Sequence, residues 1–186
     1  MFATLAVAVA LIAWAIWTYN RLIGLKNQVD NGWRQIDVQL KRRRDLIPNL
    51  VAAVRGYFQY EGDALERVIA ARARAAAAPS VHDSSAAEAD LSRALRQLLM
   101  VVENYPQLRA NENVLQLQEE LTTTENQLGF ARQYYNDVVT RFNTQREVFP
   151  ASLIASASGF NRAELFAADD EDRAAPSVDL SLRPNR

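Results

Sequence analysis

The chain has 186 residues, and 49% of them are apolar, which suits one domain with a hydrophobic core and argues against a disordered chain. A net charge of −1 provides no overall attraction for nucleic acid, and the absence of cysteine excludes disulfides, thiolate metal sites and thiol catalysis. Six glycines and six prolines leave long uninterrupted segments, so we expect an all-α fold.

The first element is an apolar run. Between Phe2 and Trp17 the only polar residue is Thr4. With Met1 and Thr18 this run would make a helix of about 27 Å, close to the ~30 Å hydrocarbon thickness of a bilayer. We therefore predict a single membrane-spanning anchor at residues 1–18. Its lipid-facing side chains are expected to include Phe2, Leu5, Val7, Leu11, Ile12, Trp14, Ile16 and Trp17.

A cleavable signal peptide is the alternative interpretation of this run, because residues 13–15 resemble the small-residue pattern of a cleavage site. However, no basic residue precedes the run, and Trp14, Trp17 and Tyr19 form an aromatic belt typical of a membrane surface. We favour a retained anchor. Because Arg21 and Lys26 lie after the run, the positive-inside rule predicts an outside N-terminus and a cytoplasmic bundle.

The next element continues the anchor. Apolar residues recur at steps of three and four from Leu22 to Leu40, which predicts that one helix leaves the membrane without interruption. The same period extends to Val68. Pro48 cannot donate to the carbonyl of Arg44, so we expect a kink or a break at residues 44–48 and two helices, at 19–45 and 46–77.

A loop is expected at residues 79–85, where Pro, Ser, His and Asp follow one another. Ser85 and Glu88 have the spacing of a capping box, which predicts that the next helix covers residues 86–104. Pro106 then marks a second break.

The longest pattern is a heptad repeat sustained for five repeats, with its core positions at 114, 121, 128, 135, 142 and 149. A helix from about Asn111 to Phe149 would be roughly 57 Å long, and its partners must be long as well. We expect an elongated antiparallel bundle of about four long helices at residues 19–166, continuous with the anchor. The acidic residues 167–186 are expected to form a flexible tail.

Two surface features are candidates for contacts between helices or between subunits. The first is the basic cluster Lys41, Arg42, Arg43 and Arg44, which can be a solvated face, a site for anionic lipid or a site for an acidic partner. Its distance from the anchor, about 36 Å along a straight helix, favours contacts within the bundle or between subunits. The second is a stripe beside the heptad core, which faces either a neighbouring helix or another subunit. Its members are Thr122, Gly129, Asn136 and Asn143.

No convincing catalytic or metal-binding set is present in the sequence. The only histidine, His82, lies among Ser80, Asp83, Ser84 and Ser85, and residues this close in one loop do not converge as a triad does. No Glu-x-x-His occurs for a carboxylate metal site, and Glu119, Glu120 and Glu125 read as a solvated flank. We expect no enzymatic activity, no cofactor, no metal, no nucleic acid and no small-molecule substrate.

Several segments together resemble the LemA family of bacterial membrane proteins over nearly all of residues 19–180. The matching segments are "IDVQLKRRRDLIPNLV" at 36–51, Tyr105 to Asn111, Leu117 to Leu121, Arg132 to Asn143, and Phe149 with Pro150. The resemblance implies a single-span anchor in the bacterial inner membrane and an elongated helical bundle, and it implies no activity. One branch of the family is linked to building magnetosome membranes, and members are often encoded near membrane proteins such as a metalloprotease.

These features predict a membrane scaffold that self-associates as a homo-oligomer. The alternative is an adaptor that presents a partner, such as a membrane protease or its substrate, through the basic cluster or the acidic tail. A hydrolase that uses His82 is a distant third hypothesis.

Overall fold

The computed structural model describes residues 1–58 and 61–166, and this part of the chain contains helices without strands. The predicted all-α fold is therefore confirmed. The helices are α1 (Phe2–Arg55), α2 (Gly62–Ala77), α3 (Val81–Glu103), α4 (Pro106–Arg109), α5 (Glu112–Glu147) and α6 (Ala151–Ala157). The predicted acidic tail at 167–186 lies outside the described residues.

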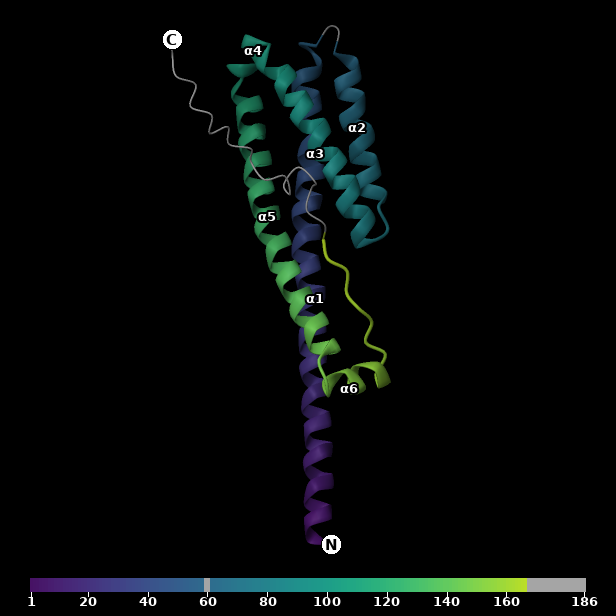
Figure 1. Ribbon diagram of the computed structural model, residues 1–186. Helices are drawn as coiled ribbons and strands as arrows, with labels where there is room; N and C mark the ends of the chain where they lie inside the picture. The colour runs from purple at the N-terminus through teal and green to yellow at the C-terminus, as the bar shows by residue number, and fades with distance from the viewer. Residues whose placement is uncertain (59–60, 167–186) are drawn as a thin grey trace, which may run out of the picture.

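Helix α1 is a single rod of 54 residues. Its first part, residues 2–17, extends out of the bundle, and we call it the stalk. The rest of α1 is the central helix of the bundle (Figure 1). Thr18, at 1% exposure, is the first buried residue from the N-terminus. The stalk is long and apolar enough to cross a bilayer. The predicted continuity between the N-terminal apolar segment and the bundle is thus correct.

The prediction at residues 44–48 was a kink or a break, and the break is wrong: Pro48 lies inside α1, which is helical to Arg55, so the first helix does not end at residue 45. Proline costs a helix one hydrogen bond to the carbonyl four residues earlier. That carbonyl belongs to Arg44, and it instead accepts a hydrogen bond of 2.7 Å from Nε of Arg72 on α2. The side chain from a neighbouring helix therefore compensates for the bond that Pro48 removes.

Helices α2 and α3 form an antiparallel hairpin beside the upper half of α1 (Figure 1). The hairpin turn is shorter than the predicted loop at 79–85, and the predicted cap at Ser85 and Glu88 is wrong. Helix α3 begins at Val81, because Ser80 is the N-cap and its Oγ accepts a hydrogen bond of 3.0 Å from the amide of Asp83. Ser85 and Glu88 are both buried one and two turns further on.

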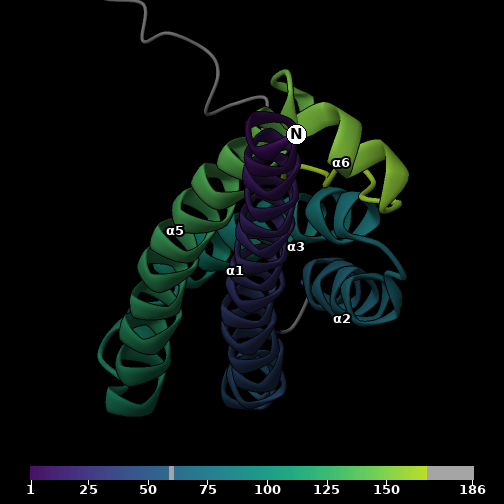
Figure 2. The same ribbon diagram turned by 90° about the horizontal axis from the view of Figure 1, so that it is seen from below.

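The predicted long helix is confirmed as α5, which is capped by the side chain of Asn111. It packs along α1 over most of its length, and seen along α1 the α2–α3 hairpin lies on the opposite side (Figure 2). Gly32 permits a close approach here, since a Cβ added to it would lie 3.3 Å from Cα of Tyr135. Among the predicted heptad core positions, Phe149 is the exception, because it lies beyond α5 and is 76% exposed.

The core consists of two hydrophobic clusters along the rod. The upper cluster joins α1, α2, α3, α4 and α5 and includes Leu50, Leu98 and Val114. The lower cluster joins α1 and α5 with the segment after α6 and includes Ile36 and Leu128. The bundle therefore has four long helices only in its upper half, and the segment at residues 158–166 takes the place of the α2–α3 hairpin in the lower half (Figure 1).

Candidate functional site

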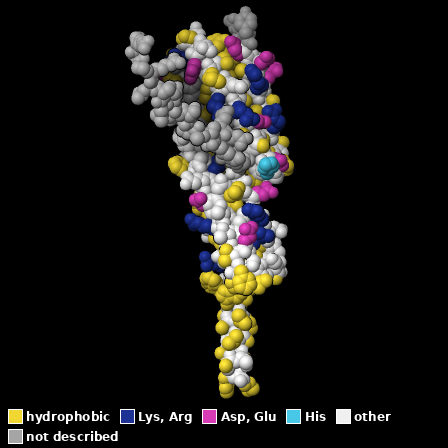
Figure 3. All heavy atoms as spheres, viewed as in Figure 1, with side chains coloured by type: hydrophobic (Ala, Val, Ile, Leu, Met, Phe, Trp, Pro, Cys, Tyr) yellow, Lys and Arg dark blue, Asp and Glu magenta, His cyan; other side chains and the backbone are white. Residues whose placement is uncertain are grey.

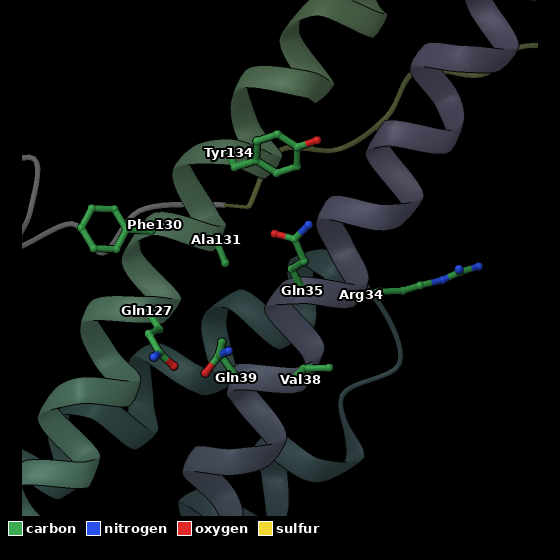
Figure 4. Close-up of a pocket in the computed structure, with 8 residues that line it drawn as sticks. All are labelled: Arg34, Gln35, Val38, Gln39, Gln127, Phe130, Ala131 and Tyr134. Atoms are coloured by element: carbon green, nitrogen blue, oxygen red, sulfur yellow. The ribbon is translucent and has the colours of Figure 1, made fainter.

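The candidate site is a groove between α1 and α5, with a volume of about 560 Å³. All of its lining residues belong to these two helices (Figure 4). Gln35 and Gln39 point into the space between the helices, whereas Phe130 on α5 and Arg34 on α1 point away from it on opposite sides (Figure 4). The floor is polar and the edges carry apolar side chains. We call this surface the α1–α5 groove.

The edges of the α1–α5 groove expose unusually large apolar side chains for a helix surface. Phe130 is 74% exposed, Val38 is 61% exposed and Tyr134 is 42% exposed. At the floor, Oε1 of Gln39 is buried and has no hydrogen-bond partner in the described part of the chain. Clustered exposed aromatic and aliphatic side chains beside a groove are typical of a protein contact surface.

A buried ionic centre lies between the two hydrophobic clusters, since Arg43 separates Leu40 from Ile47 on α1 and Glu125 separates Leu121 from Leu128 on α5. Nη1 of Arg43 lies 3.7 Å from Oε2 of Glu88 and 3.1 Å from Oε2 of Glu125, and its Nη2 donates a 2.9 Å hydrogen bond to Oγ of Ser92. Nη1 of Arg44 lies 3.1 Å from Oε1 of Glu88. We call Arg43, Arg44, Glu88 and Glu125 the ionic centre. It connects α1, α3 and α5 at one level of the rod.

The four residues of the predicted basic cluster therefore have different surroundings. Arg43 is 5% exposed and belongs to the ionic centre. Arg44 is half-buried and also lies 3.8 Å from Asp37. Lys41 and Arg42 are exposed. Two of the four basic residues, Arg43 and Arg44, thus form ion pairs with carboxylates of other helices in the described part of the chain.

Glu88 is the only member of the ionic centre that is fully buried. Burial raises the pKa of its carboxyl above the usual value of 4.5, and the nearby charges of Arg43 and Arg44 offset part of that effect. Between these two pKa values the folded chain binds more protons at Glu88 than the unfolded chain does. Stability from this group is therefore greatest below pH 4.5 and falls as the pH rises through the raised pKa.

This linkage predicts a pH-dependent difference between the natural chain and Glu88→Gln, which lacks the titrating group. The free energy of unfolding of the natural chain, minus that of the variant, should fall as the pH rises above 4.5 and through the raised pKa of Glu88. Thermal unfolding of both full-length proteins in the same detergent, followed by circular dichroism, measures it. A difference that stays constant or rises with pH would contradict the assignment.

The two asparagines of the predicted stripe bind backbone. Asn143 and the backbone of Ala163 exchange two hydrogen bonds of 2.9 Å each. Asn136 makes the equivalent pair with Phe166, at 3.0 and 2.9 Å. Seven residues of helix span about 10.5 Å and three residues of extended chain span about 10 Å, so the two spacings match. Their partner in the structure is an extended segment of the same chain, a possibility that the stripe alone did not suggest.

The other two members of the stripe are open. Thr122 and Gly129 are exposed, and nothing lies within 4 Å of a Cβ added to Gly129. Gly129 precedes Phe130, so this small residue lies at the edge of the α1–α5 groove. Among residues 1–58 and 61–166, no neighbour packs against this mid-helix glycine.

Candidate catalytic residues are not brought together. His82 is exposed in the first turn of α3, where it is visible at the surface (Figure 3). Ser84 and Ser85 are buried on the other face of that helix. Within residues 1–58 and 61–166 no group of three or more His, Asp or Glu side chains could hold a metal ion. In the ionic centre each carboxylate lies beside an arginine, at 3.1 Å for Glu125 with Arg43 and for Glu88 with Arg44.

The sequence favoured contacts of the basic cluster within the bundle or between subunits, but the carboxylate partners Glu88 and Glu125 were missed although a signal for Glu88 exists. Glu88 lies on the same helical stripe as Ser84, Leu91 and Leu95, which is the buried face of α3. Arg43 lies in the same way between Leu40 and Ile47 on α1. Opposite charges on the buried faces of two helices predict a pair. Glu125, read as part of a solvated flank, instead contacts Arg43 from α5.

The predicted anchor residues lie on the stalk. Phe2 is 85% exposed and Trp17 is 56% exposed, and the other apolar members of the set are similarly open except Trp14, which is half-buried. The stalk thus presents apolar side chains on all sides, as a helix surrounded by lipid does.

Comparison with known proteins supplies the family context. Residues 32–180 match the LemA family. A protein named LemA from Metamycoplasma hominis is 24% identical over 156 residues, which cover 83% of this chain and 71% of that protein. The magnetosome proteins MamQ 1 and MamQ 2 of Paramagnetospirillum magneticum are each 23% identical over 184 residues, covering 85% of this chain and 68% of theirs. None of these names denotes an enzyme.

Proposed function

This chain belongs to the LemA family, and from that premise we propose that it is a non-enzymatic, membrane-anchored scaffold that associates with further copies of itself and organises the bacterial inner membrane. The observation that carries the proposal is the α1–α5 groove. Its exposed Val38 lies on α1, the helix that continues the stalk, and its exposed Phe130 lies on the partner helix α5. A soluble monomer gains nothing from such an edge.

Anchoring restricts how copies can meet. Chains inserted in the same direction share an axis along the membrane normal, so a symmetric pair must rotate about that axis. Rotation in front of the α1–α5 groove brings Phe130 of one copy opposite Val38 and Arg34 of the other at the same height. An aromatic ring would then meet an aliphatic side chain and a guanidinium group, both favourable partners. Gly129 beside it leaves room for a close approach.

The direction of insertion is part of the proposal. Arg21, Lys26 and Arg34 follow the stalk, and the positive-inside rule places them in the cytoplasm together with the bundle. A reporter fused after Arg186 that works only outside the cytoplasm would refute this orientation.

The relatives give the proposal its membrane context by analogy. MamQ 1 and MamQ 2 are named as magnetosome proteins. The match covers 85% of this chain and 68% of each of them, which supports a shared overall organisation. A family supports many roles, so the function of this chain must be tested on its own surface.

Cysteine crosslinking tests the proposed contact directly, because the natural chain contains no cysteine. We expect Val38→Cys/Phe130→Cys to form disulfide-linked dimers in native membranes under mild oxidation. Phe130→Glu in the otherwise natural chain should lose self-association, measured as the protein mass in lipid nanodiscs, since a carboxylate would be buried in an apolar contact.

Met100→Glu is the matched control, because Met100 is a similarly exposed apolar residue, at 58%, on the distant helix α3. It should leave self-association unchanged. If Phe130→Glu and Met100→Glu behave alike, the α1–α5 groove is not the contact. If native crosslinks join mainly a foreign membrane protein at this groove, the chain is an adaptor instead.

A further inference from the structure

We propose that the base of the bundle is a second membrane-contact surface, which rests in the headgroup region of the same bilayer that the stalk spans. This surface consists of the turn after α5 and of α6, and we call it the basal collar. The inference rests on the proposed anchoring and deepens it, because it assigns lipid contacts to residues far from the stalk in sequence.

The level of the basal collar along α1 carries the first step. Trp17 is still 56% exposed, and Thr18 is the first residue of α1 that the rest of the chain buries. The packed bundle therefore starts where the apolar stalk ends. If the stalk fills the hydrocarbon layer, the bundle has no gap between itself and the membrane surface.

The side chains of the basal collar carry the second step. In α6, Ala151 and Ala155 lie one turn apart and are buried against the bundle, whereas Leu153 lies between them and is 63% exposed. Just before α6, Val148 is 51% exposed and Phe149 is 76% exposed. Hydrophobic side chains gather at the base of the bundle around the start of the stalk (Figure 3). Helix α6 thus exposes the large apolar side chain of Leu153 on the side away from the bundle, beside the exposed Val148 and Phe149.

The basal collar is fixed to the end of the stalk. The ring of Phe160, which follows α6, lies 5.9 Å from the ring of Tyr19 on α1 and 6.2 Å from that of Phe142 on α5. Nε of Arg146 donates a 2.8 Å hydrogen bond to the carbonyl oxygen of Phe160. The collar cannot move away from the membrane without breaking these contacts, so its height is set by that of Tyr19.

Charge beside the collar favours a lipid surface as the occupant. Arg21 lies about 6 Å along α1 from Trp17, within one screening length of the surface, and its guanidinium lies 5.3 Å from that indole ring. Arg162, after α6, has a side chain 72% exposed and lies 3.9 Å from Glu147. Aromatic rings with basic side chains just beyond them are the composition of a membrane interface.

Attachment to the membrane at both the stalk and the basal collar would fix the orientation of the rod. A stalk alone leaves the rod free to tilt and to rotate in the membrane. A collar in the headgroup region on one side of α1 would hold both, and the α1–α5 groove would then face along the membrane plane in every copy.

Spin labels on single cysteines test the collar in the full-length chain reconstituted in vesicles of equal parts phosphatidylethanolamine and phosphatidylglycerol. The label positions are Leu153→Cys in the collar, Trp17→Cys at the end of the stalk, and Met100→Cys on α3. The measured quantity is the collision rate with oxygen, which concentrates in lipid, divided by that with a water-soluble nickel complex. We expect the ratio at Leu153→Cys to approach that at Trp17→Cys and to be well above that at Met100→Cys.

The outcomes separate the two proposals. If Trp17→Cys has a lipid-like ratio and Leu153→Cys has the aqueous ratio of Met100→Cys, the collar is refuted and the anchor stands. If Trp17→Cys is itself aqueous, the proposed anchoring fails. A label at Leu153→Cys that neither reagent reaches would mean that protein covers the collar, which also refutes a lipid contact.

Discussion

Replacing Glu88 by Leu should lower the free energy of unfolding by about 3–5 kcal/mol, because it removes a fully buried carboxylate that lies between two arginines. The guanidinium of Arg43 is itself buried, and arginine cannot lose its charge in a protein. Glu125 would remain its only carboxylate partner. Thermal unfolding of the full-length chain in mild detergent should show a melting temperature lower by roughly 10 °C.

Arg43→Met, which removes the basic partner of the same ion pair, provides the comparison. It leaves Glu88 with Arg44, and a carboxyl can also take up a proton where an arginine cannot lose one. Arg43→Met should therefore cost less than Glu88→Leu. The double variant should be more stable than the sum of the single losses predicts, since it leaves less unpaired charge. Equal costs for the two single variants, or simple additivity, would contradict this description of the ionic centre.

Gly32→Leu should have the second-largest effect, a loss of about 1–3 kcal/mol or more. A Cβ at this position would lie 3.3 Å from Cα of Tyr135 and 3.4 Å from Cδ2 of the same residue. A side chain can rotate away, but the Cα belongs to the backbone of α5, so a leucine must push α1 and α5 apart. The lower hydrophobic cluster, which both helices build, would then lose packing.

Gly24→Leu is the matched control for that substitution, because it lies in the same helix and nothing is within 4 Å of an added Cβ. Leucine is a better helix former than glycine, so this control should be neutral or stabilising by a few tenths of a kcal/mol. The measurement is the same thermal unfolding. If the two variants melt at the same temperature, the close approach of α1 and α5 at Gly32 is not important for stability.

Local periodicity predicted the parts of the fold that depend on one helix at a time. The heptad repeat gave α5 nearly its observed length, and the period from Leu22 to Leu40 gave the continuity of the stalk with the bundle. One failure is local, because Ser80 rather than Ser85 caps α3. The failure at Pro48 involves a partner distant in sequence. Pro48 stays inside α1 because Arg72, on another helix, binds the carbonyl that proline leaves free. No pattern near Pro48 announces that hydrogen bond.

The candidate surfaces show the same limit. The stripe of Asn136 and Asn143 was recognisable from sequence. Its partner is the backbone of an extended segment. Every residue has the same backbone groups, so no sequence pattern indicates which segment the asparagines bind. The sequence pattern does not distinguish Phe130 as a contact residue, because it lies outside the heptad core positions. Its exposure beside a groove becomes visible only when α1 and α5 are placed together.

The mass of the full-length chain in lipid nanodiscs tests the central claim most directly. Measured by light scattering with the lipid contribution subtracted, the protein mass should correspond to two or more copies of the 20.9 kDa chain, and Phe130→Glu should reduce it to one. Met100→Glu should keep the mass of the natural chain. A natural chain that is monomeric in nanodiscs over the whole accessible range of protein-to-lipid ratios would contradict a self-associating scaffold.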